Sequence, residues 1–158
     1  YAKAGLASLM TAHVIFDALD PGVPATMSHK AQTGLLRGEL GYDGVLVSDD
    51  LEMKAIADNY KVDEAAIQCV LAGVDLMLVC HRADRQRAAI EALVKAVESG
   101  RVPSARIEEA NRRLDVLASR FAHPAGEWLA LLGGDAHRRL AEGLSADFVG
   151  KDPTEALA

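Results

Sequence analysis

Residues 44–50 read Gly-Val-Leu-Val-Ser-Asp-Asp and give the strongest single indication of how this chain folds. The apolar run is continuous rather than alternating, which is typical of a parallel strand covered on both faces. Similar apolar runs stand at residues 6–11 and 74–79, and a helical pattern follows each of the three. Alternating strands and helices predict an α/β fold with a parallel sheet and right-handed crossovers.

The predicted helices have recognisable start and stop signals. Ser28 is a favoured N-cap, and Gly41, Gly73 and Gly100 are placed to end three of the helices. Three strands cannot close a barrel, so the unit is either a small doubly wound sheet or part of a larger fold. We expect helices over residues 28–40, 62–72, 83–99 and 104–121, and a short helical pattern from Leu51.

Composition and charge narrow the class of protein. The chain has 158 residues, of which 50% are hydrophobic and 25% charged, as in soluble globular domains. The formal net charge of -6 argues against a nucleic-acid partner, because such proteins usually carry a basic surface. No apolar run approaches the roughly 20 residues of a membrane span, and no signal peptide is visible. The arginine clusters stand among acids on predicted helices and are interpreted as solvated faces: 82–87, 112–113 and 138–139.

The two cysteines bear on the cellular location of the chain, and the tail bears on its division into domains. Cys69 and Cys80 stand in apolar surroundings and are interpreted as reduced core residues, which favours a cytoplasmic location. From residue 122 the pattern weakens, although the apolar residues from Trp128 onward predict one more loose helix. We therefore divide the chain into residues 1–121 and a partly helical tail, 122–158.

Polar residues follow all three predicted strands, where the active sites of parallel α/β proteins lie. Asp49 and Asp50 follow the second strand, His13 lies just beyond the first, and His81 follows the third. His13 is either a pocket residue or a histidine satisfied by loop carbonyls, and His81 suits a surface or capping role. The sequence shows no metal-ligand spacing, no phosphate-binding glycine loop and no nucleophile elbow.

The two adjacent acids should point in opposite directions. Side chains alternate along a strand, so Asp49 shares a face with Val45 and Val47, whereas Asp50 points with Leu46 and Ser48. Asp50 is the better candidate to cap the helical pattern that follows, because Asp is a favoured N-cap. A carboxylate at a strand end can be a nucleophile, a general base, a metal ligand or a phosphoacceptor, and the residues alone do not choose among these.

Five segments follow one another along the chain: Leu9-Met-Thr-Ala-His-Val14, Pro24-Ala-Thr26, Leu35-Leu-Arg-x-Glu-Leu-Gly-Tyr-Asp-Gly-Val45, Val47-Ser-Asp-Asp-Leu-x-Met53 and Ala72-Gly-Val-Asp-Leu76. Together they resemble glycoside hydrolase family 3, and more narrowly its bacterial β-N-acetylhexosaminidases. The similarity covers roughly residues 6–121 in unbroken order. The β-glucosidase branch of the family usually has Trp after the nucleophile, whereas this chain has Asp50.

The resemblance implies a partial (β/α)₈ barrel, roughly its units six to eight, and a retaining hydrolase. Asp49 would be the catalytic nucleophile, Met10 would line the sugar pocket and His13 would shape its rim as a second substrate-binding residue. The substrate would be a small carbohydrate, terminal N-acetylglucosamine on peptidoglycan fragments, with no cofactor. The general acid/base of this branch is a histidine on a mobile loop, and no histidine of this chain stands in that motif.

Two other interpretations remain open at this point. A strand that ends in Ser-Asp-Asp also resembles the phosphoacceptor strand of signalling receiver domains, although Cys80 and His81, not lysine, follow the next strand. The chain could also be a truncated hydrolase without catalytic activity. If it is a partial barrel, its inner sheet face should be open, formed by Leu9, Val45, Val47, Leu76 and Leu78 or by their alternates.

Overall fold

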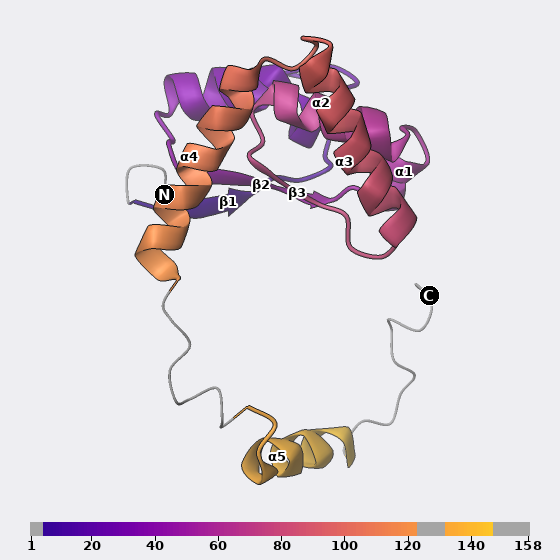
Figure 1. The fold of residues 1–158 in the computed structure, drawn as a ribbon, viewed down its shortest axis with the longest axis vertical. Helices are drawn as coiled ribbons and strands as arrows, with labels where there is room; N and C mark the ends of the chain where they lie inside the picture. Colours follow the sequence, from indigo (N-terminus) through magenta and orange to yellow (C-terminus); the bar gives the residue numbers. More distant parts are fainter. Residues whose placement is uncertain (1–4, 123–131, 147–158) are drawn as a thin grey trace. The chain divides into compact units, whose positions relative to one another are not determined.

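The computed structural model describes residues 5–122 and 132–146, which belong to two separate units, residues 1–122 and 123–158 (Figure 1). The first unit contains a three-stranded parallel sheet in sequential order, which confirms the predicted parallel α/β arrangement. The two outer strands are shorter than the predicted runs 6–11 and 74–79, whereas the central strand continues two residues past its predicted end at Ser48. They are β1 (Ser8–Met10), β2 (Val45–Asp50) and β3 (Leu76–Leu78).

The helices of the first unit follow the strands in the predicted order. The first long helix differs from expectation, because the N–H of Leu40 donates to the carbonyl of Leu35, the wider spacing of a π-helix. Ser28 does act as a cap, since its hydroxyl oxygen accepts from the N–H of Ala31 at 3.1 Å. The helices are η2 (Ala25–Met27), η3 (Lys30–Glu39), α1 (Lys54–Ala57), α2 (Val62–Ala72), α3 (Ala83–Glu98) and α4 (Ser104–Phe121).

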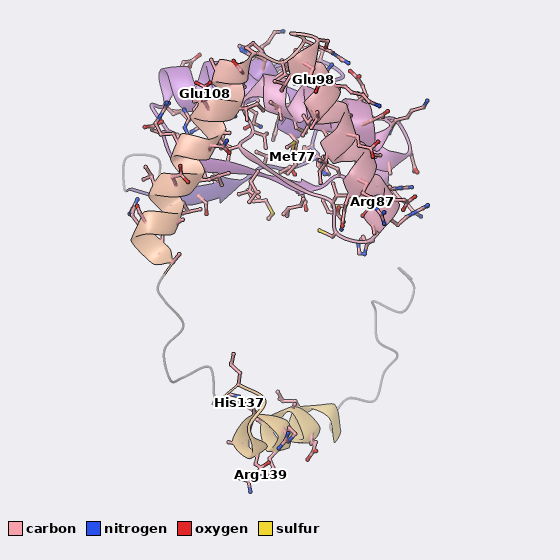
Figure 2. The ribbon with its side chains drawn as sticks, in the orientation of Figure 1. Met77, Arg87, Glu98, Glu108, His137 and Arg139 are labelled. Carbon is pink, nitrogen blue, oxygen red and sulfur yellow. The ribbon has the colours of Figure 1, made fainter. Side chains whose placement is uncertain are left out.

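One face of the sheet is covered by helices. Leu46 and Ser48 are fully buried on that face, and Met77 of β3 packs in both hydrophobic clusters beneath α2 and α3. Figure 2 shows Met77 between the strands and the helices, whereas Arg87, Glu98 and Glu108 lie on the outer surface of the helices. The larger cluster has the buried members Met27, Leu51, Ile56, Ala65, Ala66, Cys69, Val74 and Ala89.

The opposite face of the sheet is open among the described residues of this unit. Met10 pairs with Val47, and Val47 pairs with Leu76, so the three side chains lie on one face. Met10 is 57% exposed and Leu76 39%. The expected position of Leu9 on this face is wrong, because Leu9 pairs with the buried Leu46 and Met10 takes its place. The expectation that Val45 would be open is also wrong, because Val45 is only 1% exposed.

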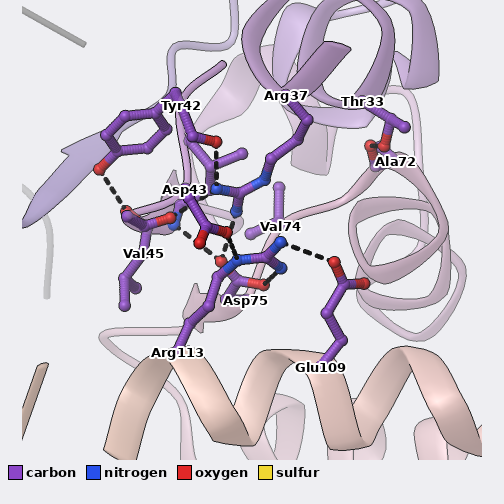
Figure 3. A network of polar contacts seen from close by, with 12 residues as sticks. Thr33, Arg37, Tyr42, Asp43, Val45, Ala72, Val74, Asp75, Glu109 and Arg113 are labelled. Carbon is purple, nitrogen blue, oxygen red and sulfur yellow. Dashed lines mark hydrogen bonds and ion pairs between the residues drawn. The ribbon is translucent and has the colours of Figure 1, made fainter. Parts of the chain in front are cut away.

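A buried ion cluster fixes the amino-terminal end of the sheet (Figure 3). The Asp75 carboxylate, which is fully buried, lies 2.7 Å from Arg37 and from Arg106 and 3.3 Å from Arg113. It also accepts from the N–H of Leu46 at 3.0 Å. Burial lowers the pKa of the Arg37 guanidinium, and the Asp75 carboxylate opposes that shift.

The interpretation of residues 112–113 as a solvated face is therefore wrong for Arg113. Its side chain is 10% exposed and also contacts Asp43 and Glu109, both visible in Figure 3. Cys80 was likewise placed wrongly in the core: Cys69 is buried, but Cys80 is exposed at the end of β3. The sequence pattern indicated which residues are charged or apolar but not which neighbours they would meet.

The second unit contributes one described helix, α5 (Asp135–Ala146), with His137 and Arg139 labelled in Figure 2. Leu140 and Leu144 are exposed on it, while Trp128 lies outside the described residues. In the described parts of the chain, every helix is too short or too polar to cross a membrane.

Candidate active site

The carboxyl ends of the three strands are connected through Asp50. Beyond β1, Nε2 of His13 lies 3.0 Å from the carbonyl oxygen of Asp50. Beyond β3, the N–H of Cys80 donates to Oδ1 of Asp50 at 3.2 Å. The polar residues that follow the three strands therefore meet at one edge of the sheet.

Asp49 lies at the carboxyl end of the central strand. Val47 pairs with Leu76 whereas Asp50 pairs with Leu78, so Ser48 and Asp49 stand within an irregularity of the β2–β3 pairing. Oδ1 of Asp49 accepts a hydrogen bond of 2.8 Å from the N–H of Asp50. Across the described residues, Oδ2 has no hydrogen-bond partner, so one carboxylate oxygen is held and the other is available to a ligand.

Asp50 occupies a different environment from the one we predicted. Helix α1 begins at Lys54, so Asp50 does not cap it. Its Oδ1 instead accepts from the N–H of Glu52 at 3.1 Å and from that of Cys80, and its Oδ2 lies 3.2 Å from Nε2 of His81. The Asp50 carboxylate therefore joins the loop after β2 to the loop after β3.

Glu52 strengthens the same connection and was missed in the sequence. Its side chain is 4% exposed, and Oε2 accepts from the N–H of His81 at 2.6 Å and of Arg82 at 3.1 Å. Arg85 lies 3.6 Å from the other carboxylate oxygen. An acid two residues past a strand looks like a surface residue in a sequence, and no signal there indicates that a later loop folds onto it.

Ser48 was also missed as a functional position. Its buried hydroxyl oxygen accepts from the N–H of Leu78 at 2.9 Å, at the point where the register between β2 and β3 shifts. A side chain thus replaces a backbone acceptor of the sheet ladder just before Asp49. The local geometry of the Ser-Asp-Asp segment therefore depends on all three side chains.

His13 is held at both ring nitrogens. Nδ1 lies 3.0 Å from Oγ1 of Thr26, and Nε2 faces the carbonyl of Asp50. The hydroxyl of Thr11 in turn donates to Oγ1 of Thr26 at 2.9 Å. The ring nitrogens therefore bond to one threonine hydroxyl and one backbone carbonyl. Of the two interpretations of His13 in the sequence, this agrees better with a histidine whose ring is satisfied by nearby protein groups.

Met10 borders an apolar groove of about 500 Å³ beside β1. The groove is lined by residues of β1, of the loop after it and of η3, including Leu9, Phe16, Leu35 and Leu36. Within the described ranges, no group of three or more His, Cys, Asp or Glu side chains is arranged to hold a metal ion. The chemistry that this arrangement can support is that of a carboxylate with one oxygen held and one free.

Comparison with known proteins gives the family. Residues 2–117 match the glycosyl hydrolase family 3 N-terminal domain. A β-N-acetylglucosaminidase of this family from Paenibacillus sp. str. FPU-7 is 49% identical, with a TM-score of 0.79 over 91% of this chain and 28% of that one. The β-N-acetylglucosaminidase from Thermotoga maritima is 33% identical, with a TM-score of 0.69 over 75% of this chain and 26% of that one.

A curated relative of known name supports the same family. β-Hexosaminidase A from Pseudoalteromonas piscicida is 34% identical over 153 residues, which are 84% of this chain and 25% of that protein. The chain thus spans between a quarter and three tenths of the length of these relatives. The family match leaves no role for the receiver-domain alternative. The chain belongs to glycoside hydrolase family 3, and its relatives place it in the β-hexosaminidase branch of that family.

Proposed function

We propose that this chain supplies the nucleophile of a retaining β-N-acetylhexosaminidase, and that the nucleophile is Asp49. One observation carries the proposal: Asp49 lies at the carboxyl end of the central strand, with Oδ1 fixed by the Asp50 N–H. Active sites of barrels of this kind lie at that end of the strands. The position and the available Oδ2 suit attack on an anomeric carbon.

The reaction proceeds in two balanced steps. Oδ2 of Asp49 bonds to the anomeric carbon while the bond from that carbon to the aglycone oxygen breaks, and a general acid protonates the departing oxygen. Water then attacks the same carbon, releases the sugar and restores the carboxylate, while the conjugate base takes the proton of the water. Two inversions at one carbon give net retention.

The other catalytic groups come from outside these 158 residues. We assign residues 1–121 to units six to eight of the barrel, which places the loop of the acid/base in the units before them. Met10 ends the neighbouring strand β1 on the open sheet face and is proposed to line the sugar pocket. Since general acid–base help is typically worth about 10²–10⁴-fold, the isolated chain is expected to show no turnover.

The substrate is proposed to be terminal N-acetylglucosamine on peptidoglycan fragments, and the location cytoplasmic. The names of the relatives support the sugar, and the free Cys69 and Cys80 support a reducing compartment. Comparison of the rates at which the chimera described below hydrolyses a purified N-acetylglucosamine-containing muropeptide and chitobiose tests the aglycone. Faster hydrolysis of chitobiose would reject the muropeptide.

A chimera tests the nucleophile. Residues 5–122 of this chain would replace the matching segment of the Paenibacillus enzyme, which the alignment of 91% of this chain makes feasible. We expect the folded chimera to release p-nitrophenol from the aryl β-N-acetylglucosaminide, and its Asp49→Asn variant to be inactive, because an amide does not form the glycosyl-enzyme.

Asp58→Asn is the matched control, since Asp58 is exposed and lies just beyond α1. It should leave activity unchanged. Activity in the Asp49→Asn chimera equal to that of the parent would reject the assignment of the nucleophile. A folded parent chimera without activity would favour the alternative of a non-catalytic barrel segment.

A further inference from the structure

We propose that His13 is a positioning residue for Asp49, which acts by fixing the peptide carbonyl of Asp50. This inference rests on the nucleophile proposed above. It differs from the expectation that His13 binds the sugar, because both ring nitrogens are already engaged by protein atoms. His13 belongs to a chain of hydrogen bonds, the His13 relay, formed by Thr11, Thr26, His13 and the carbonyl of Asp50.

The carbonyl of Asp50 fixes the direction of the bond from Nε2 of His13, and the directions of the other two bonds follow for the neutral ring. A peptide carbonyl accepts and never donates, so Nε2 of His13 must carry a proton to bond to the carbonyl of Asp50 at 3.0 Å. In the neutral ring Nδ1 is then bare and accepts the hydroxyl proton of Thr26. The oxygen of Thr26 remains free to accept the hydroxyl proton of Thr11 at 2.9 Å.

Burial protects this direction from competition by solvent. Thr26 is fully buried and Thr11 is 7% exposed. A buried hydroxyl that loses its partner has no water to replace it, so a reversed or broken relay is disfavoured. The segment Pro24-Ala25-Thr26 therefore has a role in holding the ring of His13, because η2 places Thr26 beneath it.

The relay acts on the residue that orients the nucleophile. The N–H of Asp50 donates to Oδ1 of Asp49, and the carbonyl of the same residue accepts from His13. A backbone shift at Asp50 would therefore move the hydrogen bond that holds the Asp49 carboxylate. Misplacement of reacting groups by about 1 Å costs on the order of 10²-fold in rate.

The first test uses the 158-residue chain and needs no activity. Long-range ¹H–¹⁵N correlation spectra of the imidazole rings should show that the neutral ring of His13 is the Nε2–H tautomer, with His13→Gln identifying its signals. Thr26→Val should remove the donor to Nδ1 and shift the Nδ1 resonance. An Nδ1–H tautomer of the neutral ring would overturn the relay.

The second test uses the chimera and separates positioning from sugar binding. His13→Phe should lower kcat by roughly 10–100-fold and leave KM within about twofold. His13→Gln should retain more of kcat, because its amide N–H can still donate to the carbonyl of Asp50. A KM that rises while kcat is unchanged would overturn the inference in favour of direct contact with the sugar.

Two control variants test whether the loss of a histidine, or of a threonine hydrogen bond, lowers kcat when the residue lies away from Asp49. His29→Gln changes an exposed histidine, and Thr33→Val removes a 2.8 Å bond to the carbonyl of Ala72, away from Asp49. Both should leave kcat unchanged, with thermal melts reporting the fold of each variant.

The outcomes separate this inference from the proposed function. If the parent chimera folds but is inactive while His13 shows the expected tautomer, the proposed function is rejected. If the parent chimera is active and Thr26→Val and His13→Phe keep full kcat, this inference is rejected.

Discussion

The carboxylate of Asp50 accepts a hydrogen bond of 3.2 Å from the backbone N–H of Cys80, 30 residues away in the chain. Through this bond the central strand of the sheet holds the loop that follows its neighbour. The same carboxylate accepts from the N–H of Glu52 and lies beside His81. The residue after the proposed nucleophile is therefore a connector between two strand ends.

Substitutions at Asp50 should separate hydrogen bonding from charge. Asp50→Asn keeps Oδ1 as an acceptor for the N–H groups of Glu52 and Cys80, so its effect should be small, at about 1 kcal/mol or less of unfolding free energy. Asp50→Ala removes the acceptor, and the amide of Cys80 should exchange its hydrogen at least about tenfold faster, in line with about 1.4 kcal/mol. Hydrogen exchange followed by NMR measures this, and equal exchange in the two variants would contradict the connector role.

The sequence predicted the parts of the site that depend on local pattern. The continuous apolar run before Asp49 indicated a parallel strand, and the pairing of Val47 with Met10 agrees with alternation up to Val47, whereas the shift in register after it was not predicted. The open face was expected, but two of its residues were wrong, because Leu9 faces the other way and Val45 is buried. Residues 9 and 10 are both apolar, so the pattern does not tell whether Leu9 or Met10 faces outward.

The parts that were not predicted depend on partners distant in the chain. Asp75 meets Arg37 and Arg113 across 38 residues in each direction. A sequence shows charges at helical spacing but not the acid that faces them, so Arg113 looked solvated. The role of Glu52 was not predicted for the same reason. Its partners are the backbone N–H groups of His81 and Arg82, and because nearly every residue has such a group, the sequence does not mark these two as partners.

Removal of the Asp75 charge should be strongly destabilising. Asp75→Asn leaves three arginines around a neutral, fully buried group, and breaking a buried ion pair typically costs about 3–5 kcal/mol. Asp84→Asn is the control, since the Arg82–Asp84 pair is well exposed and solvent screens such pairs, so its loss should change stability little. Urea unfolding of the two variants measures the difference. Equal midpoints would show that the cluster around Asp75 adds no stability.

The two cysteines should react at very different rates. Burial raises the pKa of the Cys69 thiol to about 12, so about one molecule in ten thousand carries the thiolate at pH 8. Partial desolvation and the Asp50 carboxylate also raise the pKa of Cys80, but this thiol is exposed. Alkylation at pH 8 should therefore modify Cys80 first, and Cys69 in a Cys80→Ser variant should react only after urea is added.

The same pKa shift predicts how stability changes at high pH. The folded chain holds the Cys69 proton more tightly than the unfolded chain, so the contribution of the protonated thiol to the free energy of unfolding is fully present below the ordinary thiol pKa. This contribution is lost as the pH rises toward about 12, by about 1.4 kcal/mol per pH unit at most. Cys69→Ala should show a shallower decline between pH 9 and 11, and parallel declines in the two proteins would contradict the shift.

The open face of the sheet should make the isolated chain self-associate. Met10 and Leu76 are exposed beside Val47, and apolar grooves of about 500 and 280 Å³ flank β1 and β3. Apolar surface left in water costs roughly 25 cal/mol per Å², and contiguous patches beyond a few hundred Å² are unusual on soluble monomers. Free strand edges on both sides add unpaired backbone groups that can pair with another copy.

Charges placed on that face should oppose the association. We expect the chain to sediment as a dimer or larger species and to bind a hydrophobic dye, and the Met10→Lys, Leu76→Lys double variant to bind less dye and shift toward monomer. Asn59→Lys with Asn111→Lys adds the same charge at exposed sites on other surfaces and should leave both readings unchanged. If the parent chain is a monomer with a cooperative melt and binds no dye, the open face is covered in solution. The partial-barrel assignment would then need another explanation for the exposure of Met10.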